Sequence, residues 1–159
     1  MLKKLSAILL TSGCLLVPAL QAKTSYLFTQ IGQQVTVKPC ARKHCDYTIL
    51  MTGLTRDEVT YFSDRPKHFT GAITIEKFMA NWSKGEDSFA KDHPNASFVY
   101  FDNRNQITQD VVRLSQPKFD KVNHSLQYNV KMIGKGRIQP GTYQHPVLFI
   151  DPGWNPNAF

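Results

Sequence analysis

The polar side chains best suited to chemistry lie in the central part of this 159-residue chain. Asp64 and Arg65 belong to a Ser-Asp-Arg-Pro turn, and Asp87 follows a segment that we expect to be helical. An arginine and a carboxylate form a bidentate, orienting contact, so an Arg65–Asp87 pair would hold two loops together. We expect that structural role. The alternative is a ligand pocket whose candidate residues are Tyr61, Asp64, Arg65, Trp82, Asp87, Ser88 and Asn95.

The same stretch contains the side chains of a small hydrolase, although no assembled catalytic motif is visible. Ser88 lies in Asp-Ser-Phe-Ala and lacks the Gly-x-Ser-x-Gly elbow of the α/β-hydrolases. A nucleophile–base pair of Ser63 or Ser88 with His68 or His93 would depend on the fold to bring the partners together. A glycosidase pair that includes Glu86 would need a carboxylate separation that sequence does not fix. The hydrolase alternative therefore rests on Asp64, Arg65, Asp87, Ser88 and His93.

This arrangement of motifs resembles an uncharacterised family of small exported bacterial proteins. The resemblance rests on the segment YFSDRP, a downstream Phe and Trp on a short helix, and the segments DSFA and PNA. It covers roughly residues 48–102, and the chain departs from the family pattern at His93, where a second proline is expected. The resemblance implies export, but it implies no activity.

The first 22 residues have the layout of a secretory signal peptide. Lys3 and Lys4 form a basic start, the next sixteen residues carry no charge, and cleavage is expected after Ala22. A lipoprotein signal ending at Cys14 is the alternative, but the apolar run continues beyond that cysteine. We therefore predict a secreted or periplasmic protein, not an integral membrane protein after cleavage. Residues 23–159 would form a single β-rich domain with an irregular tail from about residue 151.

Two cysteines remain after that cleavage, Cys40 and Cys45. In an oxidising compartment they are expected to form one disulfide that closes a short basic loop. The alternative is a metal or redox site formed with His44, but a closed zinc site needs a fourth ligand. We therefore predict the disulfide and neither a metal nor another cofactor.

Short strand-like segments recur through the chain, each bounded by turn residues. The clearest is 125–132, where Leu126, Tyr128, Val130 and Met132 alternate with polar residues. About seven such segments predict a mainly β fold, a two-sheet antiparallel sandwich that is immunoglobulin-like in general architecture.

One segment breaks the β pattern and predicts a short amphipathic helix. Thr74 can cap it, and Ile75, Phe78, Met79 and Trp82 follow at the spacing of one helix face. We expect this apolar face to pack on the sheets.

Composition limits the class of partner. Without Lys3 and Lys4 the chain carries 17 Lys and Arg against 12 Asp and Glu, a net charge of +5, and the basic residues are spread out. The sequence contains no stripe of basic residues interleaved with aromatic residues, so we do not predict nucleic-acid binding. We therefore predict a non-enzymatic binding or interaction protein with a protein, lipid head group or glycan as its partner. An anionic surface is favoured over a neutral one because of long-range attraction, and a structural role in the cell envelope is a further alternative.

Overall fold

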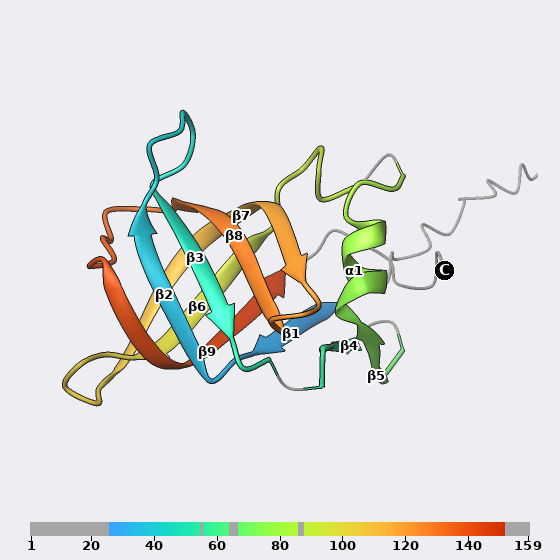
Figure 1. The fold of residues 1–159 in the computed structure, drawn as a ribbon. Helices are drawn as coiled ribbons and strands as arrows, with labels where there is room; N and C mark the ends of the chain where they lie inside the picture. The colour runs from blue at the N-terminus through green and yellow to red at the C-terminus, as the bar shows by residue number, and fades with distance from the viewer. Residues whose placement is uncertain (1–25, 55, 64–66, 86–87, 152–159) are drawn as a thin grey trace, which may run out of the picture.

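The computed structural model describes residues 26–54, 56–63, 67–85 and 88–151, which form nine β-strands and one short α-helix (Figure 1). The elements are β1 (Leu27–Ile31), β2 (Gln34–Pro39), β3 (Tyr47–Thr52), β4 (Glu58–Ser63), β5 (Phe69–Thr74), α1 (Ile75–Asn81), β6 (Asn95–Phe101), β7 (Ile107–Asp120), β8 (Ser125–Met132) and β9 (Gly141–Asp151). The prediction of a mainly β, antiparallel fold with one helix is confirmed. The predicted signal segment 1–22 and the tail 152–159 lie outside the described residues.

The sheet closes on itself, whereas we predicted two separate layers. Its strand order is β2-β3-β8-β7-β6-β9, and β9 pairs back with β2, so these strands form a closed six-stranded barrel. β1, β4 and β5 extend the sheet beyond β9 to one side of the barrel (Figure 1). The expected immunoglobulin-like sandwich is therefore corrected to a barrel with a three-stranded extension.

Closure depends on a break between β1 and β2, which both lie antiparallel to β9. At the break, the Gly32 N–H donates to the Pro146 carbonyl (3.0 Å) and the His145 N–H donates to the Gln33 carbonyl (2.8 Å). A Cβ atom at Gly32 would lie 3.1 Å from the Thr52 carbonyl oxygen, so this close approach favours glycine. The break lets β2 stay in the barrel while β1 leaves it to pair with β4.

Alternating side chains fill the barrel. In β8, Leu126, Tyr128 and Val130 are fully buried, as their period of two predicts. The Tyr128 hydroxyl donates to Oε1 of Gln30 at 3.0 Å, so a polar pair lies within the apolar interior. Burial raises the pKa of Tyr128 well above its ordinary value, because an ionised phenol would be poorly solvated there.

The helix α1 packs at one end of the barrel (Figure 1). Thr74 caps it, since its Oγ1 accepts the Lys77 N–H at 3.2 Å. The predicted apolar face is confirmed: the Phe78 ring lies 5.3 Å from that of Phe28, and the Trp82 ring lies 5.8 Å from that of Tyr128.

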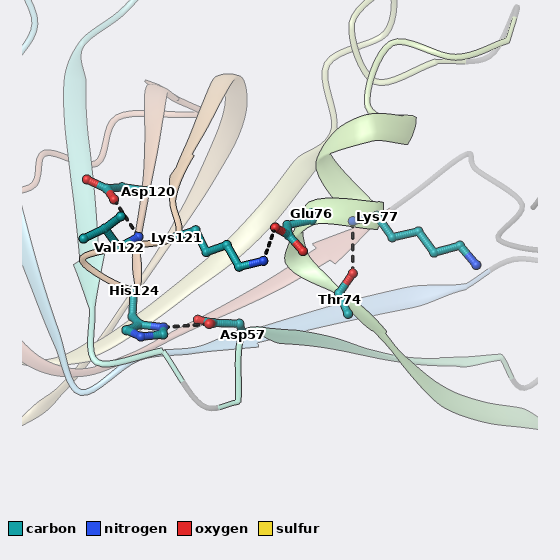
Figure 2. Close-up of polar contacts among 8 residues, drawn as sticks. All are labelled: Asp57, Thr74, Glu76, Lys77, Asp120, Lys121, Val122 and His124. Atoms are coloured by element: carbon teal, nitrogen blue, oxygen red, sulfur yellow. Dashed lines mark hydrogen bonds and ion pairs between the residues drawn. The ribbon is translucent and has the colours of Figure 1, made fainter.

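The turn between β7 and β8 is tied to two other parts of the chain (Figure 2). Lys121 Nζ lies 2.9 Å from Glu76 Oε1 at the start of α1, and His124 Nδ1 lies 2.6 Å from Asp57 Oδ2 before β4. Asp120 accepts backbone N–H groups of the turn. We call these residues, Asp57, Glu76, Asp120, Lys121 and His124, the turn cluster. Its lysine and its imidazole each face a carboxylate.

Candidate functional site

The described residues of the predicted pocket divide between the core and the surface. Trp82 is only 6% exposed, and its ring lies 5.0 Å from that of Phe89, so it belongs to the core. Tyr61 lies in β4, half-buried, with its ring 5.9 Å from that of Tyr26. The pocket residues outside the described part of the chain are Asp64, Arg65 and Asp87. The predicted ion pair and pocket therefore stay predictions.

The other predicted residues lie on the path from α1 into β6. The Ser88 side chain is buried and its Oγ has no hydrogen-bond partner among the described residues, so it is not bonded to His93. Asn95 opens β6 on the outer face, where its Oδ1 accepts a hydrogen bond from Arg113 Nε at 3.4 Å. His93 and Arg113 both line one open hollow.

This hollow, of about 490 Å³, lies on the outer face of β7 and β8 beside the loop that joins β2 to β3. We call it the basic hollow, because it is lined by four Lys or Arg side chains and two imidazoles, and by no carboxylate. Its lining residues are Arg42, Lys43, His44, Cys45, His93, Arg113, Ser115, Gln116, Asn129 and Lys131.

Side chains along β7 alternate between the barrel interior and the outer face, and the outward ones form the floor of the basic hollow. Val112 and Leu114 are fully buried in the barrel, so Arg113 and Ser115 between them face outward. The pairing with β8 then shifts register after Ser115, and Gln116 has a φ of +46°. A bulge of this kind bends a strand and re-aims a side chain, so Gln116 joins the lining.

The basic wall of the hollow is the β2–β3 loop, which stands above the barrel in Figure 1. The predicted disulfide between Cys40 and Cys45 is confirmed and closes this loop, with 5.7 Å between the two Cα atoms. Because the two sulfurs are bonded to each other, they are not thiolate ligands for the alternative metal site. Arg42 reaches from the loop to β7, where its Nη1 donates to Gln116 Oε1 at 2.8 Å.

Two of the four Lys and Arg side chains of the basic hollow are held by neutral groups. Arg42 bonds the amide of Gln116, and Arg113 bonds the amide of Asn95. Neither arginine has a carboxylate partner among the described residues. Lys131 differs, because its Nζ lies 2.9 Å from Asp46 Oδ1. The amide oxygens orient the guanidinium groups without neutralising their charge.

Asp46 lies at the edge of this region, and its carboxylate also holds the barrel wall. Burial alone would raise the pKa of Asp46, but the Met132 N–H, which donates to Oδ2 at 2.8 Å, and Lys131 together lower it below its ordinary value. The lowered pKa favours the ionised form of Asp46, which pairs with Lys131.

Such an arrangement can bind an anion. Guanidinium groups form short, charge-assisted hydrogen bonds with phosphate, sulfate or carboxylate oxygens. A concave surface with one sign of charge also attracts such ligands over a distance. Groups of three or more His, Cys, Asp or Glu side chains arranged to hold a metal ion are absent from the described ranges.

Sequence reasoning missed Arg113 and the role of Arg42, although the signal for part of the site was present. The polar face of 125–132 was predicted, and it places Asn129 and Lys131 in the lining. The alternation around Arg113 was equally readable. The missing information was the pairing of β7 with β8, which brings Arg113 opposite Lys131.

Comparisons of this chain with family models, curated proteins and solved structures give no match. Among the residues that the structure describes, no helix has the length and apolar character needed to cross a membrane.

Proposed function

We propose that this chain is an exported, non-enzymatic binding protein that holds an anionic ligand in the basic hollow. The observation that carries the proposal is that Arg42 and Arg113 face an open hollow and, within the described part of the chain, are bonded to neutral amides and to no carboxylate. Both side chains are exposed, so an incoming anion can reach them, and the planar guanidinium group suits bidentate contact with phosphate, sulfate or carboxylate. Arginines that are oriented but not neutralised remain available to an incoming anion.

Export is supported by two observations. The first 22 residues read as a signal peptide. The Cys40–Cys45 disulfide is compatible with an oxidising compartment, where such bonds form and persist. We therefore propose a secreted or periplasmic location, and kinship with the small exported bacterial proteins remains part of this proposal.

The chemistry of the lining favours an acidic group over a neutral sugar. Sugar and drug-like ligands are usually held by apolar and aromatic side chains with a few polar groups. Apart from Cys45, the lining residues here carry cationic, imidazole, amide or hydroxyl groups. We therefore propose a phosphate, sulfate or carboxylate group of a lipid head group or an acidic glycan as the part that is bound.

A titration with a fluorescent sulfated oligosaccharide tests the proposal. Arg113→Gln should weaken binding at least tenfold, because one charge-assisted hydrogen bond contributes roughly 1.5–3 kcal/mol. Affinity should also fall as salt is raised from about 0.05 to 0.2 M. The matched control is Lys121→Gln, which removes one positive charge from the turn cluster and should leave affinity unchanged.

Equal losses in Arg113→Gln and Lys121→Gln would show that only net charge matters and would contradict a site in the basic hollow. No binding of any anionic probe by the wild-type protein would contradict the function itself. Thermal unfolding of each variant shows whether the fold is retained.

A further inference from the structure

We infer that the anion bound in the basic hollow is the phosphate of an anionic phospholipid, whose hydrocarbon part lies on an adjoining apolar strip. This inference rests on the proposed function and adds the class of ligand. The strip is an outward-facing band of apolar side chains across β7, β6, β9, β1 and β4. Its residues are Val111, Val99, Phe149, Val147, Ile31 and Phe62.

Four of the six apolar residues of the strip are exposed, and Val99 and Val147 are half-buried. Val111 is 47% exposed, Phe149 39%, Ile31 47% and Phe62 48%. Their neighbours along each strand point into the core, so this face is not the inside of the barrel. Soluble monomers rarely expose contiguous apolar patches, and such patches mark surfaces that contact an apolar partner.

Strand register makes the strip continuous. Val99 lies opposite Val147, and Val147 lies opposite Ile31, so these three form an unbroken apolar row. Val111 and Phe149 lie on the same face beside this row, with Ser97 between them. Neighbouring strands are about 4.8 Å apart, so the step from β7 to β1 spans about 14 Å. That length suits an acyl chain better than a single small group.

The strip also begins at the rim of the basic hollow. Val111 and Arg113 point outward from the same strand, two residues apart, which is about 7 Å along β7. A ligand with its anion at Arg113 would therefore have an apolar surface beside it. A free phosphate or an acidic glycan would leave this surface uncovered, whereas a phospholipid matches both the charge and the apolar face.

Vesicle binding of the exported, processed protein tests this inference. Vesicles of phosphatidylglycerol should bind at least tenfold more protein than vesicles of phosphatidylcholine in a flotation assay. The double variant Ile31→Ser, Phe149→Ser removes apolar surface from the strip without touching the hollow. It should reduce vesicle binding at least fivefold while its affinity for the sulfated oligosaccharide stays within twofold of wild type. Arg113→Gln should reduce both.

The outcomes separate this inference from the proposed function. Unchanged vesicle binding by the double variant, with oligosaccharide binding still dependent on Arg113, would overturn the phospholipid and leave the anion site standing. Loss of Arg113 dependence for both probes would overturn both. A wild-type dimer that the double variant converts to a monomer, with vesicle binding unaffected, would assign the strip to a second copy of the chain and also overturn the inference. Circular dichroism and thermal unfolding check that the serine variants are folded.

Discussion

The basic side chains at the two ends of the β7–β8 hairpin contact different kinds of partner. In the turn cluster, Lys121 and His124 each face a carboxylate from another part of the chain, 2.9 and 2.6 Å away (Figure 2). In the basic hollow, Arg42 and Arg113 bond amide oxygens and, among the residues that the structure describes, no carboxylate. The turn thus contains a lysine that is paired with a carboxylate, whereas the two arginines of the basic hollow are held by neutral amides. The paired charge fastens the turn, and the two arginines remain available to a partner.

Removing the disulfide should have the largest effect on stability, and it should also weaken anion binding because the disulfide closes the loop that forms the wall of the basic hollow. In the variant Cys40→Ser, Cys45→Ser the free energy of unfolding should fall by about 2 kcal/mol, since a short loop is no longer closed in the unfolded chain. Affinity for the sulfated oligosaccharide should also fall severalfold, because Arg42 is no longer held beside β7. Urea unfolding and a binding titration measure the two effects.

If stability fell but affinity did not, the part assigned to Arg42 in the basic hollow would be wrong. That result would show that the β2–β3 loop borders the site without contributing to it, and would leave Arg113 on β7 as its main cation. Reduction of the wild-type protein should reproduce the double variant, which controls for the serine side chains.

The difference between these two regions was only partly readable from the sequence. The alternation of 125–132 predicted which side chains of β8 line the barrel and which face out, and the helix after Thr74 was predicted from its apolar spacing. Both depend on neighbours within one element. The barrel and the basic hollow depend instead on pairing between distant strands, such as β9 with β2 and β7 with β8.

Local breaks explain why the rest could not be predicted. The break at Gly32 separates β1 from β2 and thereby decides whether the sheet closes. In the sequence, a glycine at that position is equally typical of an ordinary turn. The bulge at Gln116 also leaves no clear pattern, since the residue has a φ of +46° without being glycine or asparagine. These breaks decide which side chains meet, so composition alone does not predict whether a basic side chain has a carboxylate partner.

Asp46→Asn should have an intermediate effect and would sharpen the comparison, because Asp46 is the carboxylate that neutralises Lys131 at the edge of the basic hollow. The variant should lose about 1 kcal/mol of stability at neutral pH, through weaker bonds to the Met132 N–H and Lys131. It should at the same time bind the sulfated oligosaccharide more tightly, because Lys131 is then unpaired. Opposite signs for stability and affinity are the expected result.

The pH dependence of stability provides the control for Asp46. Burial raises the pKa of this carboxyl, but the Met132 N–H and Lys131 lower it further, so the folded-state pKa lies below that of the unfolded chain. Its contribution to stability is therefore complete above about pH 4 and is lost as the pH falls through the folded-state pKa. The difference in unfolding free energy between wild type and Asp46→Asn should shrink in that acidic range. A constant difference from pH 7 to pH 2 would contradict this role of the carboxylate.

Lys121→Gln should have the smallest effect. Both Lys121 and Glu76 are largely exposed, with 72% and 53% of their side chains accessible, so water and salt screen their attraction. The pKa of Lys121 is raised by the hydrogen bond and the charge of Glu76, which shows the direction of the coupling. The melting temperature should therefore fall slightly at low salt and hardly at all at high salt, with binding of the sulfated oligosaccharide unchanged. If binding weakened as much as in Arg113→Gln, the turn cluster would also contribute to anion binding, and the division between balanced and available charge would be wrong.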